Sequence, residues 1–201
     1  MSEDSEQCPK VVILAGPNGA GKTTASPYLL RGPLEVSEFV NADVIARGLS
    51  AFNPESVAVA AARIMLNRLD ELAAAGVDFA FETTLASRSF RPRIQNLLTV
   101  GYQFHLAFLY LHDPAQAVAR VLQRVAAGGH NVPKETILRR HERGIRNFFE
   151  LFQELTDGWY MYDNSVGGHP RLIASGSGKT TEVVRDEILW AQIQDRYASK
   201  Q

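Results

Sequence analysis

An apolar run that leads directly into a glycine-rich pattern is the feature that most constrains this chain. The run covers residues 11–15, and the spacing Gly16-x-x-x-x-Gly21-Lys22-Thr23 follows it at once. Such a sequence predicts a buried strand, a turn that exposes backbone N–H groups, and a helix that begins near Lys22 with its N-terminus facing the same anion. The pattern therefore predicts a P-loop, and phosphate is the ligand that suits its geometry.

The residue types of the loop indicate a nucleotide and Mg²⁺ as its ligands. Lys22 would reach the β- and γ-phosphates, and the hydroxyl of Thr23 would ligate Mg²⁺. Asn164, which precedes a later strand, would line the adenine pocket or serve only as a turn residue. The predicted nucleotide-binding residues are Gly16, Pro17, Asn18, Gly19, Ala20, Gly21, Lys22, Thr23, Thr24 and Asn164.

A second GKTT sequence, at residues 178–181, does not have the spacing of a P-loop. The earlier glycine would have to stand at position 173, where Ile173 lies inside an apolar run. Glycine and serine are common in turns for backbone reasons alone, so we predict a surface turn there.

Composition bounds the class of protein. With 201 residues, of which 45% are hydrophobic, the chain can bury one core, so residues 11–201 are predicted to form a single domain after a disordered tail at 1–10. No apolar run approaches the ~20 residues that span a bilayer, so a cytoplasmic protein without a membrane partner is expected. Cys8 is the only cysteine, which excludes an intramolecular disulfide. The net charge of −1 offers no basic footprint for nucleic acid.

Apolar runs and helical patterns alternate along the chain. This alternation predicts an α/β fold, a P-loop NTPase three-layer sandwich whose central parallel sheet carries helices on both faces. The predicted strands are 11–15, 38–41, 79–81, 104–111 and 172–174. The predicted helices cover 54–75, 89–100 and 114–155, and two more are expected to begin near residues 22 and 182.

Polar residues at the predicted strand ends are candidates for chemistry, because ligands gather at the carboxyl ends of parallel strands. Asp43 would accept the proton of an acceptor hydroxyl, or would only cap the following helix. Glu82 would order Mg²⁺ through its waters, contact substrate hydroxyls, or be a structural carboxylate. Thr83 and Thr84 fit either substrate contact or a turn, and we take Thr83 as a substrate-binding candidate.

The region 114–155 is predicted to form a helical lid that carries arginines. Residues 128–133 interrupt two helical patterns, and among them His130 is the one histidine of interest. One apolar stripe contains Val118, Val121, Leu122 and Val125, and the other contains Leu138, Ile145, Phe148, Phe149, Phe152 and Leu155. Arg124, Arg139 and Arg140 would close over the nucleotide and neutralise the charge of the transferred phosphoryl group, or would simply be solvated.

Taken in order, these motifs resemble the zeta toxin family of P-loop kinases. They are the P-loop, the triplet 41–43, the run 81–84, the interruption 128–133, the pair 139–140 and the triplet 163–165. The resemblance implies an ATP-dependent kinase that acts on the amino sugar of UDP-N-acetylglucosamine, and a small antitoxin protein as a partner. It also implies Asp43 as the base, Glu82 in the substrate pocket, and Arg124 with Arg139 or Arg140 as the γ-phosphate clamp. This chain is shorter than many zeta toxins.

Two alternatives stay open at this stage. The chain could be a kinase of similar fold for another hydroxyl, or a switch that hydrolyses ATP slowly and acts through a partner protein. Asp43 distinguishes them, because a switch does not need a base on the acceptor side.

Overall fold

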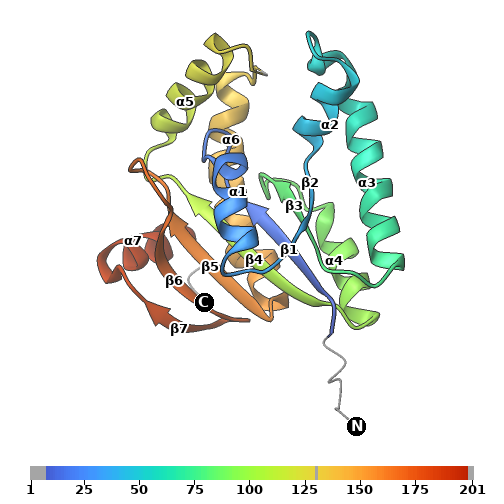
Figure 1. Ribbon diagram of the computed structural model, residues 1–201. Coiled ribbons are helices and arrows are strands. Elements are labelled where there is room, and N and C mark those ends of the chain that lie inside the picture. Colours follow the sequence, from blue (N-terminus) through green and yellow to red (C-terminus); the bar gives the residue numbers. More distant parts are fainter. Residues whose placement is uncertain (1–7, 130, 199–201) are drawn as a thin grey trace.

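A seven-stranded sheet forms the centre of the computed structural model, which describes residues 8–129 and 131–198 (Figure 1). The strand order is β2-β3-β1-β4-β5-β6-β7. Strands β1 to β5 run parallel, and β6 and β7 are antiparallel to their neighbours. The strands are β1 (Lys10–Ala15), β2 (Glu38–Val40), β3 (Phe79–Thr83), β4 (Gln103–Tyr110), β5 (Gly158–Asp163), β6 (Arg171–Ser177) and β7 (Thr180–Val184).

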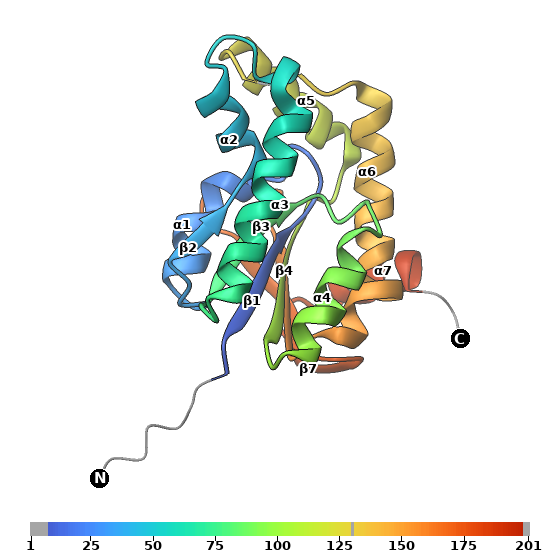
Figure 2. The ribbon, with the colours of Figure 1, turned by 90° about the vertical axis from the view of Figure 1, so that its right-hand side faces the viewer.

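Helices cover both faces of this sheet, so the predicted α/β three-layer fold is confirmed. Side chains of β1 alternate between the two faces: Val12 and Leu14 pack with α1 and α5, whereas Ile13 packs with α3, α4, α6 and α7. In Figure 2 the sheet is seen between α1 on one side and α4, α6 and α7 on the other. The helices are α1 (Lys22–Arg31), α2 (Ala42–Leu49), the 3₁₀ turn η1 (Pro54–Val57), α3 (Ala58–Ala74), α4 (Phe90–Thr99), α5 (Pro114–Ala126), α6 (Lys134–Asn147), the π-helical η2 (Phe148–Phe152), the 3₁₀ turn η3 (Gln153–Leu155) and α7 (Glu187–Tyr197).

The C-terminal part of the sheet differs from the prediction. Strand β5 was not predicted, and β7 occupies the start of the helix expected near residue 182. Threonine and valine dominate β7 and favour a strand, so α7 begins only at Glu187, where Asp186 caps it by accepting from Leu189 N at 3.0 Å. The turn predicted at the second GKTT is confirmed, because Gly178 and Lys179 join β6 to β7.

The two predicted apolar stripes of the lid region are correct only in part. Val121 and Ile145 are buried at 1% exposure, but Leu122 is 60% exposed and Leu138 is 37% exposed. The helices α5 and α6 are thus buried on narrower faces than the pattern suggested. His130 lies outside the described residues. Within those residues, no helix is both long and apolar enough to cross a membrane.

Candidate nucleotide-binding and phosphoryl-transfer site

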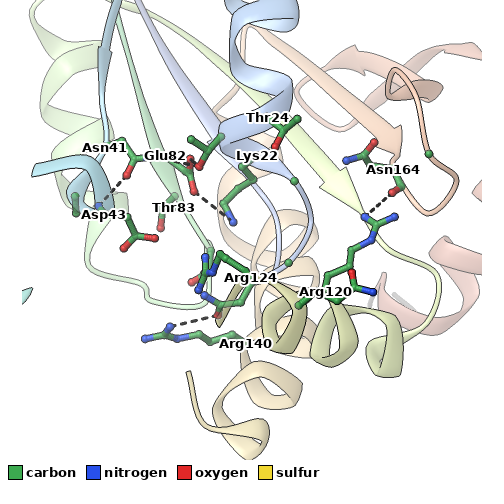
Figure 3. Close-up of a pocket in the computed structure, with 18 of the residues that line it drawn as sticks. Lys22, Thr24, Asn41, Asp43, Glu82, Thr83, Arg120, Arg124, Arg140 and Asn164 are labelled. Carbon is green, nitrogen blue, oxygen red and sulfur yellow. Dashed lines mark hydrogen bonds and ion pairs between the residues drawn. The ribbon is translucent and has the colours of Figure 1, made fainter. Parts of the chain in front are cut away.

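A cavity of about 630 Å³ lies at the carboxyl ends of the central strands (Figure 3). The P-loop after β1, the segments after β2 and β3, and the helices α5 and α6 contribute to its walls, as does the loop after β5. Its lining includes Asn18, Gly19, Gly21, Lys22, Thr23, Thr24, Asn41, Asp43, Glu82, Thr83, Thr84, Arg120, Gln123, Arg124, Arg140 and Asn164. Most of the predicted nucleotide-binding and substrate-binding residues therefore share one cavity.

Two glycines of the loop are required by its backbone. Gly16 has φ +143°, and a Cβ there would stand 2.5 Å from the carbonyl oxygen of Leu109. Gly21 adopts the left-handed conformation just before α1, with φ +79°, and a Cβ there would meet the amide nitrogen of Asn164 at 2.7 Å. A side chain at either position would be incompatible with this shape of the loop.

Lys22 is buried in the floor of the cavity, at 6% exposure. Its Nζ donates to the carbonyl oxygens of Gly16 at 2.9 Å and Pro17 at 3.0 Å, and lies 3.7 Å from Glu82 Oε1. Burial lowers the pKa of the Lys22 ammonium, and the charges of Glu82 and Asp43 oppose this shift. The lysine is therefore held in a fixed position at the loop, where a phosphate chain would be bound.

Glu82 joins three segments at the strand ends. Its Oε2 accepts from Thr23 Oγ1 at 2.9 Å and from Asn41 Nδ2 at 2.7 Å. The carboxylate and hydroxyl oxygens of Glu82 and Thr23 form the type of donor set that Mg²⁺ prefers. No cluster of three or more acidic, histidine or cysteine side chains suited to a metal occurs in residues 8–129 and 131–198.

Asn41, rather than Asp43, caps α2. Its Oδ1 accepts from the backbone N–H groups of Asp43 at 2.8 Å and Val44 at 3.2 Å. The alternative that Asp43 is the cap is therefore wrong, because α2 begins two residues earlier than that alternative requires. Asp43 instead lies in the first turn of the helix and lines the cavity.

The arginines expected in the clamp occupy different positions. Arg124 of α5 and Arg140 of α6 line the cavity, and Arg140 Nη1 donates to Asn18 Oδ1 at 3.3 Å (Figure 3). Arg139 is exposed and is not part of the lining. Adjacent helical residues point about 100° apart, so only one of this pair can face the loop.

Arg120 is a site residue that the sequence analysis did not single out. Its guanidinium donates to the carbonyl oxygens of Asn164 at 2.9 Å and Ser165 at 3.0 Å, and Asn164 Nδ2 donates to Ala20 O at 2.7 Å. The sequence analysis likewise included Asn41 only as a member of the triplet 41–43. Arg120 lies one helical turn before Arg124, and this spacing could have indicated that both arginines face the same site.

The strand order, the loop and the helices on both faces define a P-loop NTPase with a kinase-like fold. A family model described as AAA domain matches residues 11–151. The chain therefore belongs to this AAA domain family, AAA_33.

Comparisons with individual proteins give more distant likenesses. An uncharacterized protein of Haemophilus influenzae is 24% identical over 132 residues, which cover 66% of this chain and 92% of the relative. The crystal structure of AvrRxo1-ORF1 with ORF2 and ATP has a TM-score of 0.70 at 16% identity, covering 99% of this chain and 67% of that one. A structure from the PezAT toxin-antitoxin system of Streptococcus pneumoniae has a TM-score of 0.67 at 15% identity, covering 100% of this chain and 82% of that one. These structures show that the fold is shared.

Proposed function

We propose that this protein is an ATP-dependent kinase that transfers the γ-phosphoryl group to a hydroxyl of a small molecule. The observation that carries the proposal is the position of Asp43. It lines the same cavity as Lys22, and it is available as a base because Asn41 supplies the cap of α2. A carboxylate at this place favours transfer to an acceptor over a nucleotide-dependent switch.

In the proposed reaction, the acceptor oxygen forms a bond to the γ-phosphorus while the bond from that phosphorus to the β–γ bridging oxygen breaks, and ADP leaves. Asp43 accepts the proton of the hydroxyl. Lys22 binds the β- and γ-phosphates from the loop. Arg124 and Arg140, which line the cavity from α5 and α6, stabilise the charge that develops on the equatorial oxygens.

Mg²⁺ fits the proposed site. Thr23 and Glu82 would hold it, because their oxygens lie 2.9 Å apart beside the P-loop lysine. When bound, the ion neutralises negative charge on the β- and γ-phosphate oxygens. Glu82 also remains a candidate for contacts to the acceptor, together with Thr83, because both line the cavity next to Asp43.

The acceptor that we propose is a UDP-activated amino sugar such as UDP-N-acetylglucosamine. The motifs shared with zeta toxins support this choice. On the same ground we propose a small antitoxin protein as a partner, and the fold shared with a structure from the PezAT toxin-antitoxin system supports it. Residues 114–155 would act as the lid, through the cavity-lining arginines of α5 and α6.

Mass spectrometry tests the proposed function directly. The protein is incubated with Mg²⁺, ATP and a panel of UDP-sugars, other nucleotide metabolites and an oligonucleotide. We expect one phosphate added to UDP-N-acetylglucosamine or a close relative, no product with Lys22→Ala, and a rate lower by a factor of about 10²–10⁴ with Asp43→Asn. Asp113→Asn is the matched control, because Asp113 caps α5 outside the cavity and asparagine also caps well.

Two outcomes would contradict the proposal in different ways. Release of ADP without any phosphorylated acceptor would favour the switch. Transfer at the wild-type rate by Asp43→Asn would remove Asp43 from its role as base while leaving the kinase activity in place.

A further inference from the structure

Asn41 and Glu82 stand side by side at the carboxyl ends of two neighbouring strands. Val40, the last residue of β2, pairs with Phe81 of β3 in the parallel register, so Asn41 and Glu82 follow at the same level. Asn41 is buried at 5% exposure, and its Nδ2 donates to Glu82 Oε2 at 2.7 Å. Figure 3 shows Asn41 beside both Asp43 and Glu82. The sheet register therefore places an amide directly against the carboxylate of the candidate site.

Three groups of the described residues hold the Glu82 carboxylate. Thr23 Oγ1 is 2.9 Å from Oε2, Lys22 Nζ is 3.7 Å from Oε1, and the third group is the Asn41 amide. In the proposed kinase Lys22 binds phosphates and Thr23 ligates Mg²⁺, so both would turn to these ligands when the nucleotide binds. Asn41 has no such ligand in the proposed site. Its amide is therefore the group that continues to hold Glu82 when the cavity is occupied.

The orientation of the Asn41 amide is fixed from its other end. Its Oδ1 accepts from the backbone N–H groups of Asp43 at 2.8 Å and Val44 at 3.2 Å, and a reversed amide would place its NH₂ group against two donors. Nδ2 must therefore point toward Glu82. The Thr23 hydroxyl gives its own proton to Glu82, which leaves lone pairs on Oγ1 for a metal ion.

The same amide fixes the segment that carries the proposed base. Asn41 is the N-cap of α2, and Asp43 lies in the first turn of this helix. An N-cap holds the first turn by satisfying its free N–H groups, so it also fixes the position of Asp43 relative to Glu82. Groups that orient metal-binding and reacting side chains from behind are a common part of active sites. One side chain thus connects the carboxylate on the metal side to the helix of the base.

We propose that Asn41 is a positioning residue for phosphoryl transfer. Its amide nitrogen holds Glu82 where this carboxylate can ligate Mg²⁺ or its waters, and its amide oxygen holds the turn of α2 that carries Asp43. The inference rests on the proposed kinase function. Asn41 acts only through these two carboxylates and exchanges no proton. Its replacement should therefore affect metal-dependent binding through Nδ2 and the transfer step through Oδ1.

Nucleotide binding with and without Mg²⁺ tests the role of Nδ2 in the absence of any transfer. The affinity for the β,γ-imido analogue of ATP, which cannot donate its terminal phosphoryl group, is measured by calorimetry in EDTA and in Mg²⁺. The wild type should gain affinity in Mg²⁺. This gain should be at least tenfold smaller in both Asn41→Ser and Asn41→Ala, because loss of a group that orients a metal ligand costs about 10–100-fold in metal affinity. The affinity in EDTA should change less than threefold.

Transfer kinetics test the role of Oδ1. Asn41→Ser keeps an oxygen that can cap α2, so saturating Mg²⁺ should restore its kcat to within about threefold of the wild type. Asn41→Ala has no cap, and its kcat should stay at least fivefold lower under the same conditions, with the KM of the acceptor changed less than threefold. A residue that only stabilises the fold would show neither the rescue by Mg²⁺ nor this difference between the two variants.

Thr156→Val is the matched control. Thr156 is buried at 5% exposure, and its Oγ1 donates to the carbonyl oxygen of Gln153 at 2.8 Å. It precedes β5, at the amino ends of the parallel strands, and does not line the cavity. The variant loses one buried hydrogen bond and should be less stable, but it should keep the Mg²⁺ effect and the kcat of the wild type.

The inference is overturned if the gain in affinity from Mg²⁺ is the same in Asn41→Ser as in the wild type. A gain that is lost equally in Thr156→Val would also overturn it, because the loss would then follow stability alone. Equal kcat of Asn41→Ser and Asn41→Ala at saturating Mg²⁺ would remove the role of Oδ1. Absence of transfer to any hydroxyl, together with the expected loss of the Mg²⁺ effect, would instead refute only the proposed kinase function.

Discussion

The contact between Asn41 and Glu82 gives a sharp test of how the site is assembled, because one side chain has two separable roles. Asn41 Oδ1 caps α2, and Nδ2 donates to Glu82 Oε2 at 2.7 Å. The two backbone N–H groups at Oδ1 fix the orientation of the amide, since the reversed amide would place a donor against donors. Replacement of Asn41 can therefore remove one role at a time.

Asn41→Ser keeps an oxygen that can cap the helix and removes the donor to Glu82. A hydrogen bond to a charged group contributes about 1.5–3 kcal/mol, so the free energy of unfolding should fall by about that amount. Asn41→Ala removes the cap as well, which adds about 1 kcal/mol. We therefore expect Asn41→Ala to be less stable than Asn41→Ser by the value of one cap.

Asn41→Asp keeps the cap and the size of the side chain but places a second carboxylate against Glu82. Two like charges about 4 Å apart repel by roughly 4 kcal/mol at an effective dielectric constant of about 20, and Lys22, 3.7 Å from Glu82, offsets part of this. At pH 8 this variant should be the least stable of the three. Protonation of one carboxylate relieves the repulsion, so its deficit relative to Asn41→Ser should shrink as the pH falls toward 5.

Urea unfolding of the three variants between pH 5 and pH 8 measures these differences. Equal stability of Asn41→Asp and Asn41→Ser at every pH would show that the Asn41 amide does not face Glu82 in the folded protein. The assignment of Glu82 as the group that joins the ends of β2 and β3 would then fail with it.

Three further changes have expected outcomes. Gly16→Ala forces a Cβ against the carbonyl oxygen of Leu109 and should lower the free energy of unfolding by about 2–5 kcal/mol; an unchanged urea midpoint would contradict the loop geometry. Burial raises the pKa of Asp163, but hydrogen bonds from Ser165 and Arg171 outweigh this effect and hold the pKa below its usual value. The Asp163 carboxylate therefore stabilises the fold above about pH 4, and this contribution is lost as the pH falls through the lowered pKa. Arg171→Gln should therefore move acid unfolding to higher pH, as circular dichroism would show, and an unmoved transition would exclude the ion pair. Burial also lowers the pKa of His141, whose ring nitrogen is 2.8 Å from a carbonyl oxygen. The contribution of His141 to the free energy of unfolding should be complete above about pH 6.5 and decline as the pH falls below this value. His141→Gln should flatten this decline, and an equally steep decline in the variant would contradict the role of His141.

The part of the site that depends on local spacing could be predicted from the sequence. Lys22 and Thr23 follow from the P-loop pattern, because a glycine turn and the first helical residues fix their positions within a few residues of chain. The strand ends that carry Asp43 and Glu82 follow from the alternation of elements, because parallel strands place their carboxyl ends at one edge. These residues do line one cavity.

The rest of the site depends on helix rotations and helix boundaries, which a sequence pattern does not specify. Whether Asn41 or Asp43 caps α2 depends on a shift of two residues in the helix start. Whether Arg139 or Arg140 faces the cavity depends on the rotation of α6, which is set by the close contact of Gly144 with the loop after β3. Strand β5 was missed because neither of its faces is polar: Trp159 and Met161 pack on one face and Tyr160 and Tyr162 on the other, so the alternation of a half-exposed strand is absent.

The loop after β5 connects the P-loop to α5 through hydrogen bonds. The Asn164 amide occupies the space that a side chain at position 21 would need, and it donates to the carbonyl oxygen of Ala20. Arg120 of α5 holds the carbonyl oxygens of Asn164 and Ser165. If the protein is the kinase that we propose, a shift of the P-loop backbone on nucleotide binding would pass through Asn164 to Arg120, and so to Arg124 one turn further along α5. The glycine at position 21 thus serves two purposes, because it permits the left-handed turn of the P-loop and leaves room for the side chain that couples this loop to α5.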